Sequence, residues 1–315
     1  MAQNKKPLII IVGPTAVGKT ALAIRLAETL QGEIVSADSR LFFKGMDIGT
    51  AKPSREELTQ VPHHLIDVAT PDQEWSLAMY LSRTEEVIQD IHQRDSLPFL
   101  VGGTGQYIQA IVEGWDLPKT KPDPRLRKIL TQWAEEVGID GLRIRLAELD
   151  PDAAAGIDGP NLRRIVRALE VILTSGRKFS GQRGKTGSSY KILQIGLIRP
   201  RDELFQRIDQ RIAKMLDQGL VSEVKSLLDA GYTSESSAMS AIGYKQLADY
   251  LSGESTLEEA VSQIKSKTRK YVRQQANWFS DDDPNITWFS ASTDPFDEIL
   301  NEIQHFLSKI CYTES

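Results

Sequence analysis

The sequence predicts an α/β protein built on a parallel sheet with helices on both faces, into which an all-helical domain is inserted. The first observation is an alternation of short apolar runs with segments of helical spacing, beginning with residues 8–12 (LIIIV) and 21–30. Such alternation is typical of a parallel sheet, because a helix carries the chain from one strand to the next. The second is a change at prolines 118, 122 and 124, after which helical periodicity continues without strands to about Lys191.

Further elements complete the predicted core. They are strands at 33–37, 97–101 and 192–198, a helix at 75–94 capped by Ser76, and helices within 202–230 and 257–279. The predicted catalytic core therefore consists of 1–118 and 192–315, and the helical insertion of 119–191. Ligands of such sheets bind at the carboxyl ends of the strands. These ends lie at Gly13, Asp38 and Gly102.

Composition narrows the class of protein. The chain has 315 residues, 40% of them hydrophobic and 26% charged, which is enough to bury a core. No apolar run approaches the roughly 18 residues of a membrane helix, so we expect a cytoplasmic protein without a membrane partner. The lone Cys311 excludes an internal disulfide and a cysteine-based zinc site.

Charge is distributed unevenly along the chain. The net charge is −5, yet residues 119–191 contain 15 Lys and Arg against 9 Asp and Glu. A basic region in an acidic protein indicates either a polyanionic partner such as nucleic acid or a chance excess on a solvated helical surface. Charge alone does not decide between the two.

A phosphate-binding motif follows the first strand. Residues 13–20, GPTAVGKT, match G-x-x-x-x-G-K-[ST] between a buried strand and a helix, where the mechanism requires it, so the predicted fold is P-loop NTPase-like. Backbone N–H groups and the helix N-terminus favour phosphate, Lys19 adds a positive charge, and the Thr20 hydroxyl is a ligand for Mg²⁺. The predicted phosphate-binding residues are Gly13, Pro14, Thr15, Ala16, Val17, Gly18, Lys19 and Thr20.

Two more polar residues are expected at the same edge of the sheet. ATPases and GTPases usually place a metal-binding carboxylate after a later strand, but here strand 97–101 ends in Gly102-Gly103-Thr104. Asp38 instead follows strand 33–37, as a metal ligand, a base or a simple turn cap with Ser39. Thr104 opens the next helix, where it acts as an N-cap, as a donor to a diphosphate, or as both.

Several longer motifs resemble one family. In chain order they are GPTAVGKT, Asp38-Ser39, KGMDIGTAKP (44–53), PHHLIDV (62–68), VGGTGQY (101–107), RALEV (167–171), AIGYKQL (241–247) and TRKYVRQQANWF (268–279). This set is similar to the bacterial tRNA dimethylallyltransferases, also called tRNA isopentenyltransferases. The likeness covers nearly the whole chain, and DIGTAKP is not a general feature of P-loop proteins.

The resemblance implies an activity and a set of site residues. A dimethylallyl group passes from dimethylallyl diphosphate to the N6 amine of the adenosine beside the anticodon (position 37) of tRNA, with Mg²⁺. The resemblance implies catalytic roles for Asp38, Thr104 and an arginine of QRIDQRI, taken as Arg211 rather than Arg207. It implies tRNA contacts from Asp38, Ser39, Arg40, Leu41, Thr104, Arg127, Arg163, Arg164, Arg167 and Arg273. No obligate protein partner is expected, and the default is a monomer.

The chain departs from the family pattern in two places. Leu41 and Phe43 stand where many members have glutamine and tyrosine, so base contacts from that segment are expected to be partly apolar or made by the backbone. Arg273-Gln274-Gln275 replaces KRQ, which removes one positive charge from an expected tRNA contact.

Other functions remain open from the residues alone. A small-molecule P-loop kinase would share the first strand, loop and helix, with the insertion as an arginine-rich lid over ATP. An adenylate isopentenyltransferase would use a free nucleotide, and a non-catalytic tRNA-binding protein would need only the basic surface. Trp115, Trp133, Trp278 and Trp288 are expected to be packing residues, and His92 and His305 to lie at the surface.

Overall fold

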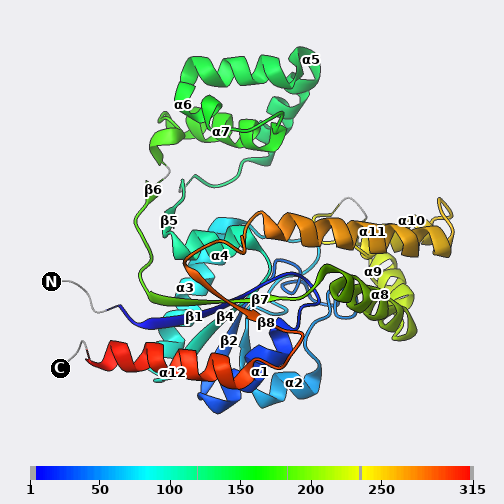
Figure 1. The fold of residues 1–315 in the computed structure, drawn as a ribbon. Helices are drawn as coiled ribbons and strands as arrows, with labels where there is room; N and C mark the ends of the chain where they lie inside the picture. The colour runs from blue at the N-terminus through cyan, green and yellow to red at the C-terminus, as the bar shows by residue number, and fades with distance from the viewer. Residues whose placement is uncertain (1–4, 119, 183, 234–235, 313–315) are drawn as a thin grey trace. The chain divides into compact units, whose positions relative to one another are not determined.

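The structure is a computed structural model that describes residues 5–118, 120–182, 184–233 and 236–312. The chain forms two compact units, a core unit of Met1–Val112 with Ser188–Ser315 and an inserted unit of Glu113–Gly187 (Figure 1). The inserted unit begins and ends earlier than the predicted 119–191. The reason is that a short antiparallel pair, β5 (Trp115–Asp116) with β6 (Gly184–Lys185), belongs to it.

The core unit alternates strands and helices. Before the insertion it contains β1 (Pro7–Val12), α1 (Lys19–Thr29), β2 (Gly32–Ala37), α2 (Arg55–Gln60), β3 (His63–His64), α3 (Leu77–Gln93), β4 (Leu97–Gly102) and α4 (Gly105–Val112). After it come β7 (Lys191–Ile198), α8 (Arg201–Asp217), α9 (Leu220–Asp229), α10 (Tyr244–Leu251), α11 (Leu257–Ala276), β8 (Ile286–Ser290) and α12 (Phe296–Tyr312). Ser76 caps α3 as predicted, since its hydroxyl accepts the Met79 N–H.

Six strands form one parallel sheet in the order β3-β2-β4-β1-β7-β8, which confirms the predicted α/β class. The registers place Ala37 beside Gly102, and Val12 beside Gly196. The residues that follow β1, β2, β4 and β7 therefore meet at one edge of the sheet. The edge strand β8 was not predicted, because its five residues follow an acidic turn and lack a clear periodicity.

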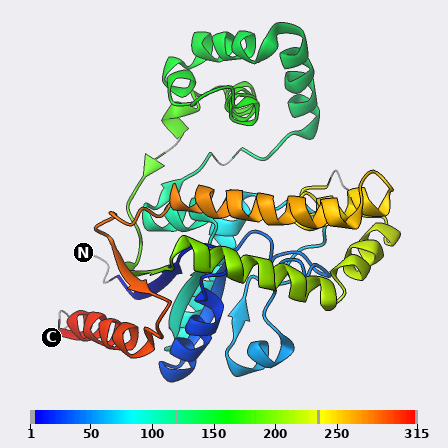
Figure 2. The same cartoon turned by 45° about the vertical axis from the view of Figure 1, so that its right-hand side comes forward.

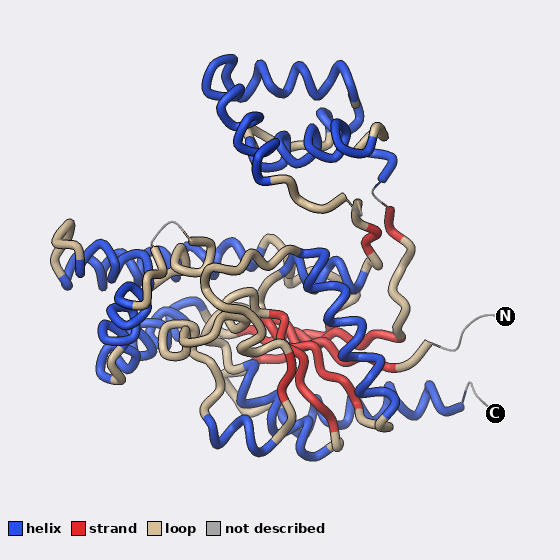
Figure 3. Tube along the Cα trace, turned by 180° about the vertical axis from the view of Figure 1, so that it is seen from behind, coloured by secondary structure: helices blue, strands red, loops and turns tan. Residues whose placement is uncertain are grey.

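Both faces of the sheet are buried, which explains why the strands are apolar without alternation. Ile9 and Ile11 face a core shared with α1, α8 and α12. Leu8, Ile10 and Val12 face the opposite core, formed with α3 and α4. Figure 3 shows the strands between these layers of helices.

The inserted unit is mainly helical. It contains α5 (Pro124–Leu149), α6 (Pro151–Ala155), α7 (Leu162–Ser175) and a 3₁₀ turn at Ser180–Gln182, in addition to β5 and β6. Helix α5 is kinked at Gly138, whose φ is +77°. The unit has its own core, in which leucines of α5 pack on the buried face of α7. None of the helices among the described residues is long and apolar enough to cross a membrane.

One prediction about the surface was wrong. His92 on α3 was expected at the surface, yet its side chain is only 8% exposed and Nε2 lies 2.8 Å from the carbonyl oxygen of Pro7. Burial lowers the pKa of this imidazole below its ordinary value. His92 therefore ties the end of α3 to the start of β1.

Candidate active site

The phosphate loop lies between β1 and α1 at the carboxyl edge of the sheet. Gly13 and Gly18 have φ values of +143° and +118°, in the region that favours glycine. A Cβ on Gly13 would lie 2.6 Å from the backbone oxygen of Leu197, so the neighbouring strand also requires glycine here. The loop thus reaches the first turn of α1, where free N–H groups and the helix dipole favour an anion.

Three cationic side chains hold the carbonyl oxygens of this loop. The bonds run from Lys19 Nζ to Gly13 O and Pro14 O (both 2.9 Å), from Arg199 Nε to Val17 O (2.9 Å) and from Arg207 Nε to Ala16 O (2.8 Å). Because C=O and N–H of a peptide plane point in opposite directions, holding these oxygens orients the N–H groups of the loop. Sequence reasoning missed Arg199 and set Arg207 aside.

A cavity of about 240 Å³ lies in the core unit at this edge of the sheet. Its polar wall contains residues of the P-loop, the segment after β2, the DIGTAKP loop and α11. These are Thr15, Asp38, Ser39, Arg40, Gly49, Thr50, Arg211, Thr268 and Tyr271. Its apolar wall comes mainly from α8, the start of α9 and α11, with Ile208, Ile212, Met215, Leu220 and Ile264. The cavity lining thus combines polar and apolar side chains.

Lys19, Asp38 and Arg211 are close enough to influence one another electrostatically. Burial lowers the pKa of Lys19 to about 8, with Asp38 opposing this shift and Arg211 adding to it. Burial also lowers the pKa of Arg211, again opposed by Asp38. Arg211 Nη2 lies 3.4 Å from the carbonyl oxygen of Thr50. Two cations and one anion thus interact at this edge, and Arg211, the arginine chosen from QRIDQRI, lines the cavity.

Asp38 and Thr104 each have a structural partner at this edge. Asp38 Oδ1 accepts the N–H of Arg40 at 2.9 Å, the local turn that was weighed as an alternative. Thr104 Oγ1 accepts the N–H of Ser39 at 3.2 Å, so the ends of β2 and β4 are joined through these side chains. Asp38 also lines the cavity, and its structural contact does not exclude a chemical role.

Tyr271 of α11 is a pocket residue that the sequence did not single out. Burial raises the pKa of its hydroxyl to about 12, and Asp38 adds to the shift. Thr104 and Gln275 act on this pKa in the opposite direction, so both side chains lie near the phenol. Tyr271 therefore brings α11 close to the turn after β4. Helices α8 and α11 run side by side along this region in Figure 2, in agreement with their contacts.

The DIGTAKP loop is held by a single carboxylate from α9. Glu223 Oε2 accepts hydrogen bonds from the N–H groups of Asp47 (2.9 Å) and Ile48 (2.7 Å). Its Oε1 accepts one from the Gly49 N–H (3.1 Å) and one from the Tyr244 hydroxyl (2.6 Å). A Cβ on Gly49 would meet the Tyr244 ring at 2.6 Å, so the loop needs glycine there. Glu223 therefore fixes the cavity wall formed by Gly49 and Thr50.

The lysine of DIGTAKP serves the same loop from its other end. Lys52 is 4% exposed, and its Nζ donates to Asp47 Oδ1 and Asp67 Oδ1 (both 2.5 Å) and to the Phe43 carbonyl (3.0 Å). The residues of the DIGTAKP motif therefore serve mainly to hold the conformation of this loop.

The segment after β2 corrects one expectation about base contacts. Phe43 is 3% exposed and belongs to the core, so its side chain does not offer the apolar base contact expected at this position. Its neighbour Phe42 is fully buried beside Tyr80 and Tyr107, whose rings stack 4.0 Å apart. Leu41 is half-buried.

The expected tRNA-contacting arginines fall into two groups. Arg163, Arg164 and Arg273 are exposed. Arg127 and Arg167 instead bind the fully buried carboxylate of Glu170, at 2.8 Å and 2.5 Å. Burial alone would raise the pKa of Glu170, but hydrogen bonds from both arginines and from a backbone N–H outweigh it and lower the pKa. This pair of arginines has a structural role inside the inserted unit.

Trp278 was expected to be a packing residue, and in the structure it is partly exposed and partly packed. Its side chain is 41% exposed, yet a Cβ on Gly105 would lie only 2.1 Å from its ring. The ring therefore covers the first residue of α4 with one face of the indole.

The residues at the P-loop fit a magnesium ion bound chiefly through its substrate. Thr20 is exposed at the start of α1, where its hydroxyl is available as a ligand. Among the residues that the structure describes, no three His, Cys, Asp or Glu side chains gather as a metal cage. Mg²⁺ commonly keeps several waters and takes phosphate oxygens with few protein ligands, so this donor set suits it.

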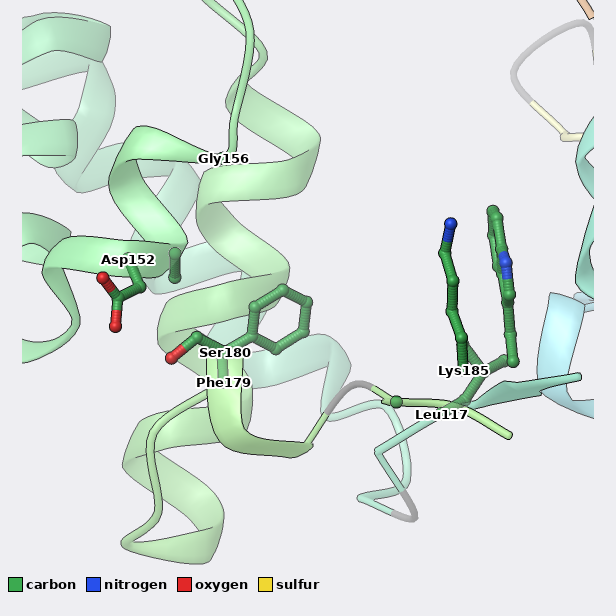
Figure 4. A pocket seen from close by; sticks show the side chains of 9 residues that line it. Leu117, Asp152, Gly156, Phe179, Ser180 and Lys185 are labelled. Carbon is green, nitrogen blue, oxygen red and sulfur yellow. The ribbon is translucent and has the colours of Figure 1, made fainter. Parts of the chain in front are cut away.

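A second cavity, of about 300 Å³, lies within the inserted unit. Its lining includes Trp115, Asp152, Phe179, Ser180 and Lys185 (Figure 4). None of its residues belongs to the P-loop or to the segment after β2. We therefore place the candidate active site at the cavity of the core unit.

The fold and the site together define a class of protein. The P-loop stands at the carboxyl edge of a parallel sheet and opens on a cavity with an apolar wall, an arrangement suited to a phosphorylated substrate with a hydrocarbon group. The family model described as IPP transferase matches residues 41–282, and the one described as Isopentenyl transferase matches residues 6–71. The chain belongs to the IPP transferase family, and it is accordingly a prenyl-group transferase.

Individual relatives are similar over most of their length. The tRNA dimethylallyltransferase of Thermomicrobium roseum is 44% identical over 95% of this chain and 91% of the relative. That of a Roseiflexus species is 50% identical over 87% of this chain and 90% of its own. These values are far above the level at which a shared fold is in question.

Solved structures agree with this assignment. The full-length tRNA isopentenylpyrophosphate transferase of Bacillus halodurans is 42% identical, with a TM-score of 0.71 and 97% of each chain covered. A eukaryotic dimethylallyltransferase caught acting on tRNA is 27% identical, with a TM-score of 0.83 over 96% of this chain and 80% of that one.

Proposed function

We propose that this enzyme transfers the dimethylallyl group of dimethylallyl diphosphate to the N6 amine of the adenosine beside the anticodon, position 37, in tRNA. The observation that carries the proposal is a cavity whose lining joins P-loop residue Thr15, Asp38 and Arg211 with a group of apolar side chains. The family and the activity named for the relatives support the same substrates. A nucleotide kinase would have no use for five apolar side chains in the lining of its phosphate site.

In the proposed reaction the adenine nitrogen attacks C1 of the dimethylallyl group. The bond between C1 and the diphosphate oxygen breaks, and the diphosphate leaves with the electron pair. Negative charge grows on that oxygen in the transition state, so donors placed there lower the barrier. Lys19, Arg211 and the N–H groups of the P-loop are the donors at this edge. Thr104 and the adjacent N–H groups provide further polar contacts.

Asp38 is the proposed base. The exocyclic amine of adenine is a poor nucleophile and must lose a proton as its bond to carbon forms. Asp38 lines the cavity, and its Oδ1 is oriented by the N–H of Arg40. The carboxylate takes the proton from N6, while Ser39 and Tyr271 belong to the polar lining around it.

Mg²⁺ is the proposed cofactor. When bound it would neutralise part of the diphosphate charge. Thr20, in the first turn of α1, would offer its hydroxyl to the ion, and the substrate would offer phosphate oxygens. The protein residues around it hold the substrate in place through Lys19 and Arg211.

The tRNA contacts are proposed from exposed basic residues. Helix α11 carries five Lys and Arg and no acidic residue within 265–273; Lys267, Lys270 and Arg273 are exposed, whereas Lys265 and Arg269 pair with Asp209. Arg163 and Arg164 are exposed on α7 of the inserted unit. Such side chains neutralise phosphates and fix the register of the RNA. The target adenosine must leave its stack, which favours a loop over a duplex as substrate. We expect no membrane partner, no obligate protein partner and a cytoplasmic location.

The test is transfer of label from dimethylallyl diphosphate to unmodified tRNA with Mg²⁺. Asp38→Asn keeps an oxygen for the Arg40 N–H but cannot take a proton, so its kcat should fall about 10²- to 10⁴-fold. Asp72→Asn, at an exposed position, is the matched control and should retain activity. Label appearing in free AMP, or turnover of ATP without transfer, would refute the proposal.

A further inference from the structure

Gln275 on α11 connects the P-loop to the turn after β4. Its side chain is 3% exposed. Oε1 accepts the N–H of Thr15 in the P-loop at 2.9 Å, and Nε2 donates to the carbonyl oxygen of Gly103 at 3.0 Å. One amide thus bridges the loop after β1 and the turn after β4.

Glutamine suits this bridge because its amide has an acceptor and a donor on the same planar group. A carboxylate has no donor for the Gly103 carbonyl, and a shorter amide does not reach both partners from the same backbone position. The bond to the Gly103 carbonyl is buried, and the bond from the Thr15 N–H is partly buried. Leaving either one unsatisfied is costly, since a buried polar group then loses its hydrogen bond without regaining water.

Side chains on α11 and just after it leave no room for a Cβ at two glycines of the VGGTG motif. A Cβ on Gly103 would lie 2.2 Å from Gln275 Nε2. One turn further along, Trp278 occupies the space that a Cβ on Gly105 would need. The turn after β4 is therefore built to receive the C-terminal end of α11, and the sequence of that turn follows from the contact.

The same bridge sets the position of cavity residues. Thr15 lines the cavity, and Thr104 directly follows the carbonyl that Gln275 binds. Tyr271, one helical turn before Gln275, lines the cavity and lies near both Gln275 and Thr104. A shift of the Gln275 side chain would move the P-loop relative to Thr104, the two elements that border the proposed diphosphate position.

We propose that Gln275 is a positioning residue that holds the P-loop against the turn after β4 in the geometry needed to bind diphosphate. The inference rests on the proposed function for the identity of the anion. It assigns Gln275 no contact with substrate. Its effect is exerted through the Thr15 N–H and the Gly103 carbonyl.

Three variants separate this role from general damage. Gln275→Ala removes both hydrogen bonds. Gln275→Glu keeps the shape and the acceptor but loses the donor to Gly103. Gly103→Ala leaves Gln275 in the sequence and displaces its Nε2 by the added Cβ. The matched control is Gln274→Ala, because Gln274 is the preceding residue on the same helix and is exposed.

The probe is inorganic diphosphate with Mg²⁺, and its dissociation constant is measured by calorimetry. We expect Gln275→Ala, Gln275→Glu and Gly103→Ala to bind about tenfold or more weakly than the wild type, which corresponds to about 1.4 kcal/mol. Gln274→Ala should bind like the wild type. In transfer assays KM for dimethylallyl diphosphate should rise by a similar factor in the three variants, while KM for tRNA stays unchanged.

Other results would overturn the inference. If the Gln275 variants unfold at lower temperature but bind diphosphate normally, Gln275 has only a structural role. An equal rise in both KM values would also contradict it. Diphosphate binding is measured without tRNA, so a wild type that binds the anion but transfers no prenyl group would count against the proposed function and leave the Gln275 result standing on its own.

Discussion

Glu223 offers a test of how the DIGTAKP loop forms the cavity wall. Its carboxylate accepts four hydrogen bonds, three from consecutive backbone N–H groups and one from Tyr244. In Glu223→Ala all four donors lose their partner. In Glu223→Gln the amide oxygen can still accept the Asp47 and Ile48 N–H groups, and the Tyr244 hydroxyl can turn to accept from the new NH₂. Only the Gly49 N–H then faces another donor.

The two variants should lose different amounts of unfolding free energy. An unsatisfied buried donor costs about 1–3 kcal/mol, so Glu223→Gln should lose about 1–2 kcal/mol of unfolding free energy. Glu223→Ala should lose about 3–5 kcal/mol, less than four full penalties, because the half-buried site admits water and the terms are not additive. The rate of prenyl transfer should fall as well, because the Thr50 carbonyl oxygen at the end of this loop accepts a hydrogen bond from Arg211.

Urea unfolding gives the free energies, and transfer kinetics give KM for dimethylallyl diphosphate. Glu28→Gln, at an exposed position on α1, is the control for removal of a carboxylate charge. Equal losses for Glu223→Gln and Glu223→Ala would refute the argument, because charge rather than the four hydrogen bonds would then dominate. An unchanged unfolding free energy of Glu223→Ala would show that the loop keeps its conformation without the hydrogen bonds of Glu223.

The remaining predictions concern charge. Because burial lowers the pKa of Lys19 to about 8, kcat/KM for dimethylallyl diphosphate should fall about tenfold per pH unit above that value. A flat profile, or an unchanged inflection in Lys19→Met, would contradict this. Glu170→Ala should destabilise the inserted unit by about 3 kcal/mol, seen as faster hydrogen exchange in α7 but not in β1. The pKa of Glu170 is lowered, so its stabilisation is present above the ordinary glutamate pKa and should disappear as the pH falls through the folded-state value. Arg211→Lys keeps the charge but loses the guanidinium fork, and KM for the diphosphate substrate should rise about tenfold with KM for tRNA unchanged.

Those parts of the site that depend on strand ends were predictable from the sequence. The P-loop, Asp38 and Thr104 each follow a short buried strand, and parallel strands bring their carboxyl ends together. The choice of Arg211 came from the family resemblance, and the cavity lining agrees with it. Local periodicity and turn residues carry this information, because they need no knowledge of distant contacts.

Residues that act across the fold could not be predicted in this way. Gln275 contacts Thr15 and Gly103, which are 260 and 172 positions away in the chain. Glu223 reaches its loop across 174 to 176 positions. No periodicity or motif spacing encodes which polar side chain on a helix faces inward at such a contact. A buried glutamine on α11 looks, in sequence, like its exposed neighbour Gln274.

The order of strands has a consequence for synthesis of the protein. The central strand β1 pairs with β4 on one side and with β7 on the other, and β7 follows the inserted unit in the chain. The inserted unit has its own core and its own strand pair, β5 with β6, so it can fold while β1 is paired with β4 but still lacks β7. Domains generally fold as the chain emerges from the ribosome. We therefore expect ribosome-bound chains from which residues 113–187 have emerged, but β7 has not, to contain a protease-resistant 113–187 segment beside a P-loop that is still cleaved. Resistance of the P-loop should appear only after β7 and β8 have emerged as well.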